Sequence, residues 1–154
     1  MFDTPADAWY VWIGVAAVSI AALGTALALP GTAPPPADRV AAAIDAVAAS
    51  EHRATDTVSL EADRMRLGPE RLALESGGRT AHAAFAYGPV VPADSKPLSR
   101  VLDGQRPAVA FGSPDEFERA LAAASAGPRR WRPTPEVLTV RRVTWEGVNA
   151  TLVG

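Results

Sequence analysis

The sequence contains no cysteine, only two histidines and a single lysine among its 154 residues. The absence of cysteine excludes disulfide scaffolds, zinc ribbons, thiol nucleophiles and iron–sulfur clusters. The histidines, His52 and His82, do not stand in an HxH, HxxxH or HExxH pattern, the spacings that bring two imidazoles to one metal ion. We therefore expect no metal site and no other cofactor.

An excess of positive charge and the common catalytic motifs are also missing. The formal net charge is −2, so the chain has no overall basic field and we expect no nucleic-acid partner. No GxSxG, GxGxxG or GxxxxGKS/T motif occurs, and these are the patterns that position a nucleophilic serine or cradle phosphates. Asp115 and Glu116 fall in the first turn of a predicted helix, where the helix dipole favours acids. The sequence predicts a protein that is not an enzyme and has no small-molecule substrate.

Residues 8–29 carry no charge and read AWYVWIGVAAVSIAALGTALAL. A helix of this length covers about 33 Å at a rise of about 1.5 Å per residue, against about 30 Å for the hydrocarbon core of a bilayer. Trp9, Tyr10 and Trp12 gather at one end, where amphipathic rings favour the membrane–water interface. We expect a single transmembrane helix over residues 8–29 behind a polar N-terminus of residues 1–7, with membrane lipid as a partner.

Two alternatives to a retained anchor remain open. Ala26-Leu27-Ala28 matches the small-residue pattern of a signal-peptide cleavage site, although residues 1–7 contain two acids and no basic residue. A buried core helix is the other alternative, but 22 residues without a charge are more typical of a membrane span.

Small residues recur along the predicted span at spacings of three and four. They form one stripe of the helix, and such stripes let transmembrane helices approach closely. Half of the span consists of small residues, so a stripe of this kind also arises by chance. The candidate helix-packing positions are Gly14, Ala17, Ala21, Gly24 and Ala28.

The orientation of the span is set by few charges. The nearest basic residue is Arg39, on the C-terminal side, and lysine and arginine mark the cytoplasmic side of a membrane. A short N-terminal anchor ahead of a proline-rich stalk is instead a design suited to display. We expect the C-terminal domain of this cell-membrane protein outside the cell, with the cytoplasmic side as the open alternative.

Residues 30–36 read PGTAPPP and predict an extended linker, and residues 37–154 predict a small α+β domain. Apolar periodicity, turn residues and a Ser113–Glu116 capping box indicate its elements. We expect an amphipathic helix over 37–51, followed by antiparallel strands over 71–75 and 80–87 that a hairpin at 76–79 joins. A loop over 89–97, a helical turn over 98–102 and a strand over 108–111 come next. The domain ends with a capped helix over 114–125 and a second hairpin from strands 136–145 and 148–153.

Positive charge is concentrated near the C-terminus. Residues 127–154 carry a net charge of +3, against −5 for residues 1–126. This region predicts contact with an acidic partner or with anionic lipid headgroups. The alternative is a solvated loop neutralised by the acidic remainder of the domain. The candidate binding residues are Arg129, Arg130, Trp131, Arg132, Arg141 and Arg142.

Asn149, Ala150 and Thr151 match the N-x-S/T acceptor sequence for N-glycosylation. Asn149 is a candidate glycosylation site if the domain lies outside the cell. The same tripeptide is common by chance, and Asn149 also fits an outward polar position of a strand.

Three stretches carry a family resemblance: residues 7–12 (DAWYVW), 80–90 (TAHAAFAYGPV) and 143–153 (VTWEGVNATLV). Together they resemble a small uncharacterised haloarchaeal family of N-terminally anchored membrane proteins that is associated with pilin-like and type IV pilus systems. The resemblance implies an envelope location but no activity and no functional residues. The chain lacks the basic residues that a prepilin peptidase reads, which sets it apart from a true pilin.

Two functions follow from these observations. The first is a non-enzymatic, single-pass membrane protein that contributes to a cell-surface or envelope assembly, in contact with other membrane or envelope proteins and associated with a pilus or secretion system. The second is a membrane-tethered binding or regulatory module that docks an acidic partner or anionic lipid through its arginine-rich C-terminal region.

Overall fold

The computed structural model describes residues 12–20 and 34–154. The chain divides into two units, residues 1–33 and 34–154. In the first unit, residues 12–20 are helical and their side chains are exposed. None of the helices within residues 12–20 and 34–154 combines the length and the apolar character of a membrane-spanning segment. The rest of the predicted span 8–29 lies outside the described residues, as does most of the linker 30–36.

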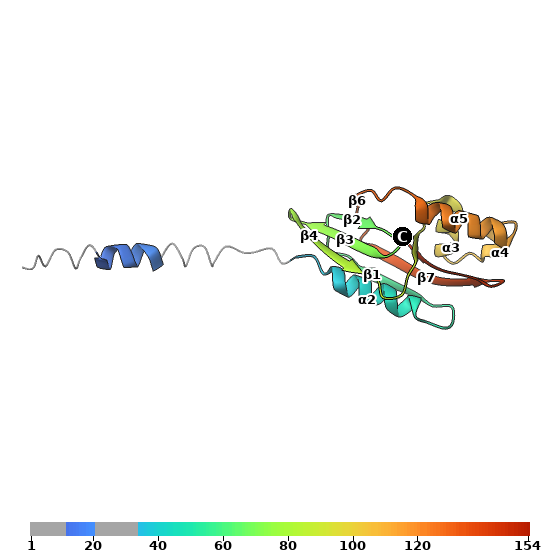
Figure 1. Ribbon diagram of the computed structural model, residues 1–154, viewed down its shortest axis with the longest axis horizontal. Coiled ribbons are helices and arrows are strands. Elements are labelled where there is room, and N and C mark those ends of the chain that lie inside the picture. The colour runs from blue at the N-terminus through green and yellow to red at the C-terminus, as the bar shows by residue number, and fades with distance from the viewer. Residues whose placement is uncertain (1–11, 21–33) are drawn as a thin grey trace, which may run out of the picture. The chain divides into compact units, whose positions relative to one another are not determined.

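The second unit is an α+β domain, as the sequence predicts, with four helices and eight strands among residues 34–154 (Figure 1). The helices are α2 (Ala37–Ala48), α3 (Lys96–Leu102), α4 (Pro107–Ala110) and α5 (Pro114–Ala126). The strands are β1 (Thr55–Ser59), β2 (Arg64–Leu67), β3 (Arg71–Ser76), β4 (Arg79–Ala84), β5 (Val90–Pro92), β6 (Arg132–Pro133), β7 (Val137–Trp145) and β8 (Val148–Val153).

The strands form two four-stranded sheets, in the orders β1-β7-β8-β5 and β4-β3-β2-β6. All pairs are antiparallel except β5 with β8. The two predicted hairpins are confirmed, β3–β4 and β7–β8. Gly77 and Gly78 in the first turn and Glu146 and Gly147 in the second all have positive φ, which is the backbone that a two-residue hairpin turn requires because it matches the twist of the strands.

Two apolar clusters lie on opposite faces of the β1-β7-β8-β5 sheet. Leu138 and Val140 of β7 face α2 and the second sheet. Val143 of β7 and Leu152 of β8 face α3 and α5 instead. Because side chains of a strand alternate between faces, β7 is a central strand that is covered on both sides. Figure 1 shows α2 on one side of the domain and the group α3–α5 at another.

The helix α5 begins as its capping signal predicts. The Ser113 hydroxyl accepts a hydrogen bond from the Glu116 amide at 3.2 Å, and the Glu116 carboxylate accepts one from the Gly112 amide at 2.9 Å. Both contacts satisfy backbone N–H groups at the helix start that have no partner within the helix. Phe117 and Leu121 are its buried residues.

Three predicted elements differ in the structure. The strand expected over 108–111 is wrong: residues Pro107–Ala110 form α4, because Pro107 supplies the fixed φ and missing donor that suit a first helical position. Residues 90–92 of the predicted loop form β5, which pairs in parallel with β8 about sixty positions along the chain. The strand expected to reach Tyr87 ends at Ala84. Beyond it, the Asp45 carboxylate of α2 accepts hydrogen bonds from the Ala86 and Tyr87 amides at 3.0 Å, so these two amides bond to α2 and not to a neighbouring strand.

Candidate arginine-lined binding site

The segment 127–132 is held at both ends by the fold. At one end α5 stops at Gly127 and Pro128, where the Gly127 amide still bonds to the Ala124 carbonyl at 3.3 Å. At the other end Arg132 enters β6 and pairs with Met65 of β2. The arginines at 129 and 130 therefore project from a short connection between a helix end and a sheet edge.

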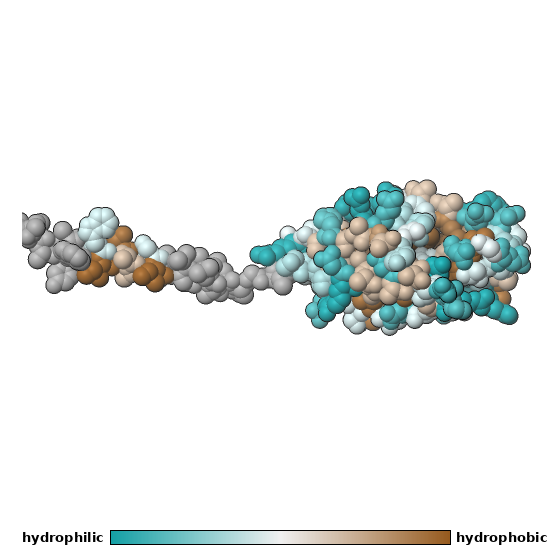
Figure 2. Space-filling model, turned by 60° about the horizontal axis from the view of Figure 1, so that its bottom comes forward, coloured by the Kyte–Doolittle hydropathy of each residue, from teal (hydrophilic) through white to brown (hydrophobic). Residues whose placement is uncertain are grey.

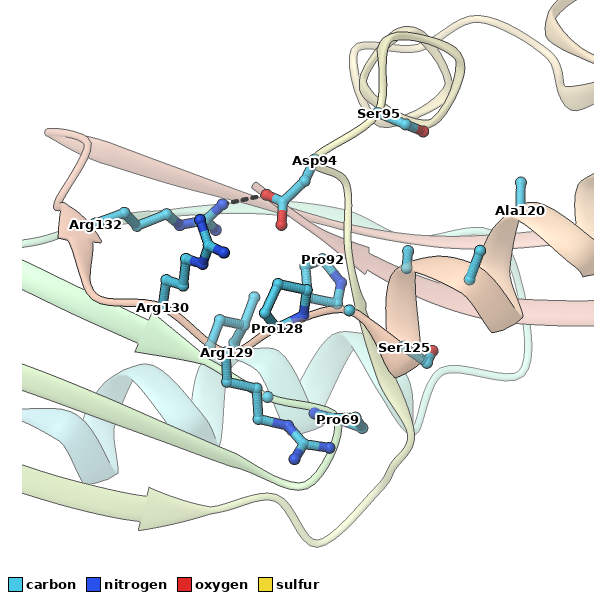
Figure 3. Close-up of a pocket in the computed structure, with 15 residues that line it drawn as sticks. Pro69, Pro92, Asp94, Ser95, Ala120, Ser125, Pro128, Arg129, Arg130 and Arg132 are labelled. Carbon is cyan, nitrogen blue, oxygen red and sulfur yellow. Dashed lines mark hydrogen bonds and ion pairs between the residues drawn. The ribbon is translucent and has the colours of Figure 1, made fainter.

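This connection forms one wall of a groove with a volume of about 670 Å³, which we call the arginine groove (Figure 3). A second wall is the last part of α5, and the others come from the turn between β2 and β3 and from the segment after β5. Most of these residues are apolar or small. The lining consists of Leu67, Gly68, Pro69, Pro92, Asp94, Ser95, Ala120, Ala123, Ala124, Ser125, Gly127, Pro128, Arg129, Arg130 and Arg132.

The arginine groove has an excess of positive charge. Arg132 forms an ion pair with Asp94 (Figure 3), and within residues 12–20 and 34–154 this is the only ion pair. Asp94 is also the only acidic residue that lines the groove. Arg129 and Arg130 are exposed and have no carboxylate partner in the described part of the chain. Their charges are therefore available to an incoming anion.

Trp131 lies among further arginines that sequence reasoning missed. The guanidinium carbons of Arg64 and Arg66 lie 5.8 and 5.0 Å from the Trp131 ring centroid, at the range of cation–π attraction. Both arginines belong to β2, in which Met65 and Leu67 are buried. The alternating pattern Arg-Met-Arg-Leu predicts that both lie on the outer face of a strand. Their proximity to Arg129–Arg132 depends on the pairing of β2 with β6, which the sequence pattern does not reveal.

Arg141 and Arg142 do not belong to the arginine groove. They are neighbours on β7, so their side chains project from opposite faces of the sheet. The Arg141 Nη1 donates to the Val101 carbonyl in the last turn of α3 at 3.0 Å, and the Arg142 Nη1 donates to the Ala48 carbonyl at the end of α2. Each guanidinium thus satisfies a carbonyl at the negative end of a helix dipole. The structure brings Arg129–Arg132 together and separates Arg141 and Arg142 from them.

Comparison with known families identifies the family of this chain. A model of a family of unknown function, DUF7283, matches residues 3–143. This chain belongs to the DUF7283 family. No curated protein and no solved structure matches it. The matched residues of this DUF7283 protein include the predicted span and the whole lining of the arginine groove.

The predicted sites near the N-terminus of this DUF7283 protein are described only in part. Trp12 is 73% exposed, and Gly14 and Ala17 lie in the exposed helical segment 12–20. Trp9 and Tyr10 lie outside the described residues, and so do three positions of the small-residue stripe, Ala21, Gly24 and Ala28.

Asn149, at the β7–β8 hairpin, is exposed. Its Oδ1 accepts a hydrogen bond from the Thr144 hydroxyl at 2.7 Å, and its Nδ2 donates to the Gly147 carbonyl at 3.3 Å. Glycosylation of Asn149 stays a prediction. His52 and His82 are also exposed, and no group of three or more histidine, aspartate or glutamate side chains in the described ranges is arranged to hold a metal ion.

Proposed function

We propose that this DUF7283 chain is a non-enzymatic, single-pass membrane protein whose domain binds an acidic, partly apolar segment of another envelope protein in the arginine groove. The observation that carries the proposal is the combination of apolar walls with the unpaired guanidiniums of Arg129 and Arg130. The proposal combines the two functions expected from the sequence: the protein docks its partner through the arginine-rich region, and it does so as part of a cell-surface assembly. We also propose that the protein is haloarchaeal and that the assembly is associated with a pilus system.

The walls and the rim of the groove favour different parts of the same ligand. Ala120, Ala123 and Ala124 are small, so the α5 wall leaves room for apolar side chains of a partner, whose burial contributes about 25 cal/mol per Å². The guanidiniums at the rim suit carboxylates, which they bind with two parallel hydrogen bonds. A segment that alternates acidic and apolar residues satisfies both. A flat lipid surface would meet the arginines but leave the recessed apolar wall uncovered.

The membrane anchor is supported by the exposed apolar side chains of residues 12–20. Figure 2 shows this segment with brown, hydrophobic surface, whereas the visible face of the folded domain mixes teal, pale and tan surface with smaller brown patches. The largest of these side chains are between 53 and 73% exposed: Trp12, Ile13, Val15, Val18 and Ile20. Such an apolar surface is stable in lipid or against another apolar helix.

The anchor is tested by protease protection. We expect a full-length chain with a C-terminal tag to fractionate with membranes at its uncleaved mass, and the tag to be digested when protease is added to intact cells. A tag that is protected until the cells are lysed would contradict the outside placement of the domain. A membrane-free form that has lost residues 1–28 would contradict the retained anchor.

The arginine groove is tested with a defined acidic ligand. The probe is a labelled eight-residue peptide that alternates aspartate and leucine, titrated onto the full-length chain in detergent micelles at low salt. We expect saturable binding that Arg130→Glu weakens about tenfold or more, equivalent to about 1.4 kcal/mol, because the reversal replaces an attraction with a repulsion. We expect Ala123→Trp to weaken it as well by filling the groove.

Matched controls separate the groove from general charge effects. Arg53 is an exposed arginine outside the groove lining, so Arg53→Glu makes the same change in net charge and should leave the affinity within about twofold. A peptide with lysine in place of aspartate should not bind. Equal losses in Arg130→Glu and Arg53→Glu, or equal binding of the two peptides, would overturn the proposal.

A further inference from the structure

A second, smaller cleft lies on the outer face of the β4-β3-β2-β6 sheet. Its volume is about 400 Å³, and it is lined by Arg66, Gly68, Pro69, Glu70, Arg71, Ala73 and Arg129. Strand alternation places Arg66, Arg71 and Ala73 on this face, because their neighbours Leu67, Leu72 and Leu74 point into the core. Arg66 and Ala73 are also directly opposite each other in the β2–β3 register. We call this the three-arginine cleft.

The three-arginine cleft has a net positive charge. Arg66, Arg71 and Arg129 contribute three guanidiniums, and the only acidic residue in the lining is the exposed Glu70. In the described part of the chain none of the three arginines forms an ion pair within 4.0 Å. Three like charges around one small cleft repel one another, and an anion bound between them removes that repulsion.

Two of the three arginines are held in position by their surroundings. The guanidinium carbon of Arg66 lies 5.0 Å from the centroid of the Trp131 ring. Arg129 lies against the turn at Gly68, where a Cβ atom would come within 3.1 Å of its Cδ and Nε atoms. A side chain at position 68 would therefore require Arg129 to shift by a few tenths of an ångström. A ligand therefore meets side chains that have already lost part of their conformational freedom, which lowers the entropy cost of binding.

We propose that the three-arginine cleft binds the phosphate group of a phosphate ester. Inorganic phosphate and a phosphate monoester present four and three free oxygens in a tetrahedral arrangement, so separate guanidiniums can each bind a different oxygen or pair of oxygens, whereas a carboxylate has only two. The cleft differs in this respect from the arginine groove, whose walls are largely apolar. The two sites share Gly68, Pro69 and Arg129, so each is tested through arginines that line only one of them: Arg130 for the groove, and Arg66 and Arg71 for the cleft.

The test is a titration of the full-length chain with inorganic phosphate and with glycerol 3-phosphate. The chain is kept in a phosphate-free detergent, ionic strength is held constant with sodium chloride, and binding is followed by calorimetry and by tryptophan fluorescence, since Trp131 lies against Arg66. We expect saturable binding that Arg66→Ala and Arg71→Ala each weaken about tenfold, the loss of one charge-assisted contact.

Arg130→Ala is the matched control, because Arg130 lines the groove but not the cleft. It should change the affinity for phosphate less than about twofold. Arg71 is exposed, so Arg71→Ala should retain the thermal transition of the parent chain and remains informative even if Arg66→Ala unfolds. No saturable binding of either ligand, or equal losses in Arg71→Ala and Arg130→Ala, would overturn the inference.

A third ligand distinguishes the two sources of the phosphate group. Glycerophosphoglycerol is a phosphodiester and represents a lipid headgroup without acyl chains, whereas glycerol 3-phosphate represents a soluble monoester. Binding of the diester at least as tight as that of the monoester assigns the cleft to lipid headgroups. Binding of the monoester alone assigns it to a soluble phosphate ester. Loss of peptide binding in Arg130→Glu with phosphate binding intact would show that the groove and the cleft act separately.

Discussion

Phe117→Ala is expected to lower the free energy of unfolding by about 3–5 kcal/mol, the range for removing a buried phenyl ring. Phe117 is fully buried between α5 and the β1-β7-β8-β5 sheet. Its ring centroid lies 5.2 Å from that of Phe111 and 6.0 Å from that of Trp145. The substitution leaves a cavity beside these neighbours, in a domain whose total stability is expected to be about 5–15 kcal/mol.

The loss should extend to the arginine groove, because the last turns of α5 form one of its walls. Urea unfolding of the full-length chain in micelles measures the stability, and the aspartate–leucine peptide measures the groove. Val109→Ala is the matched control: Val109 is 58% exposed, so its truncation should change the stability by less than about 0.5 kcal/mol. A Phe117→Ala chain with unchanged stability would contradict the packing of α5 described above.

Arg142→Ala is expected to lower the free energy of unfolding by about 1.5–3 kcal/mol, the range for a hydrogen bond to a charged group. Arg142 is partly buried on the α2 face of β7 and donates to the Ala48 carbonyl. The last turn of α2 contains no basic residue of its own, so the favourable interaction of a cation with the helix C-terminus comes from a strand 94 positions further along the chain.

Two variants define how the Arg142 contact acts. Arg142→Met keeps an unbranched apolar stem that reaches about as far as the arginine Nε, an atom that has no hydrogen-bond partner in the native domain, so it should lose less stability than Arg142→Ala. Arg53→Ala removes an exposed arginine and should change stability by less than about 0.5 kcal/mol. Thermal and urea unfolding measure all three. A loss in Arg142→Ala no larger than in Arg53→Ala would contradict a role in capping α2.

The arginine pair 141–142 therefore contacts helix ends within the domain and does not form the binding surface that its charge alone suggests. An exposed doublet on a loop would add its two charges to one binding surface. On β7 the two side chains point to opposite faces and each bonds to the end of a different helix. Both tie helices to the central strand, and the proposed binding surfaces depend on arginines elsewhere.

Local signals in the sequence determined a large part of the domain. Period-two alternation and turn glycines predict the β3–β4 and β7–β8 hairpins, and the Ser113–Glu116 pattern predicts the start of α5. These elements depend on contacts between residues close in sequence, so the residue types at short spacings are enough to predict them. The same local information predicts that Arg141 and Arg142 lie on opposite faces of one strand.

Only the tertiary structure decided the elements that depend on distant partners. Residues Val90–Pro92 become a strand because β8 supplies a parallel edge, and a run of three residues carries no periodicity that reveals this. The proposed sites arise in the same way: Arg66 and Arg71 come from one hairpin and Arg129 from the segment after α5. Arg129 is about sixty positions from the other two, so the sequence does not predict that the three charges are close. The pairing of β2 with β6 and the packing of α5 bring them together.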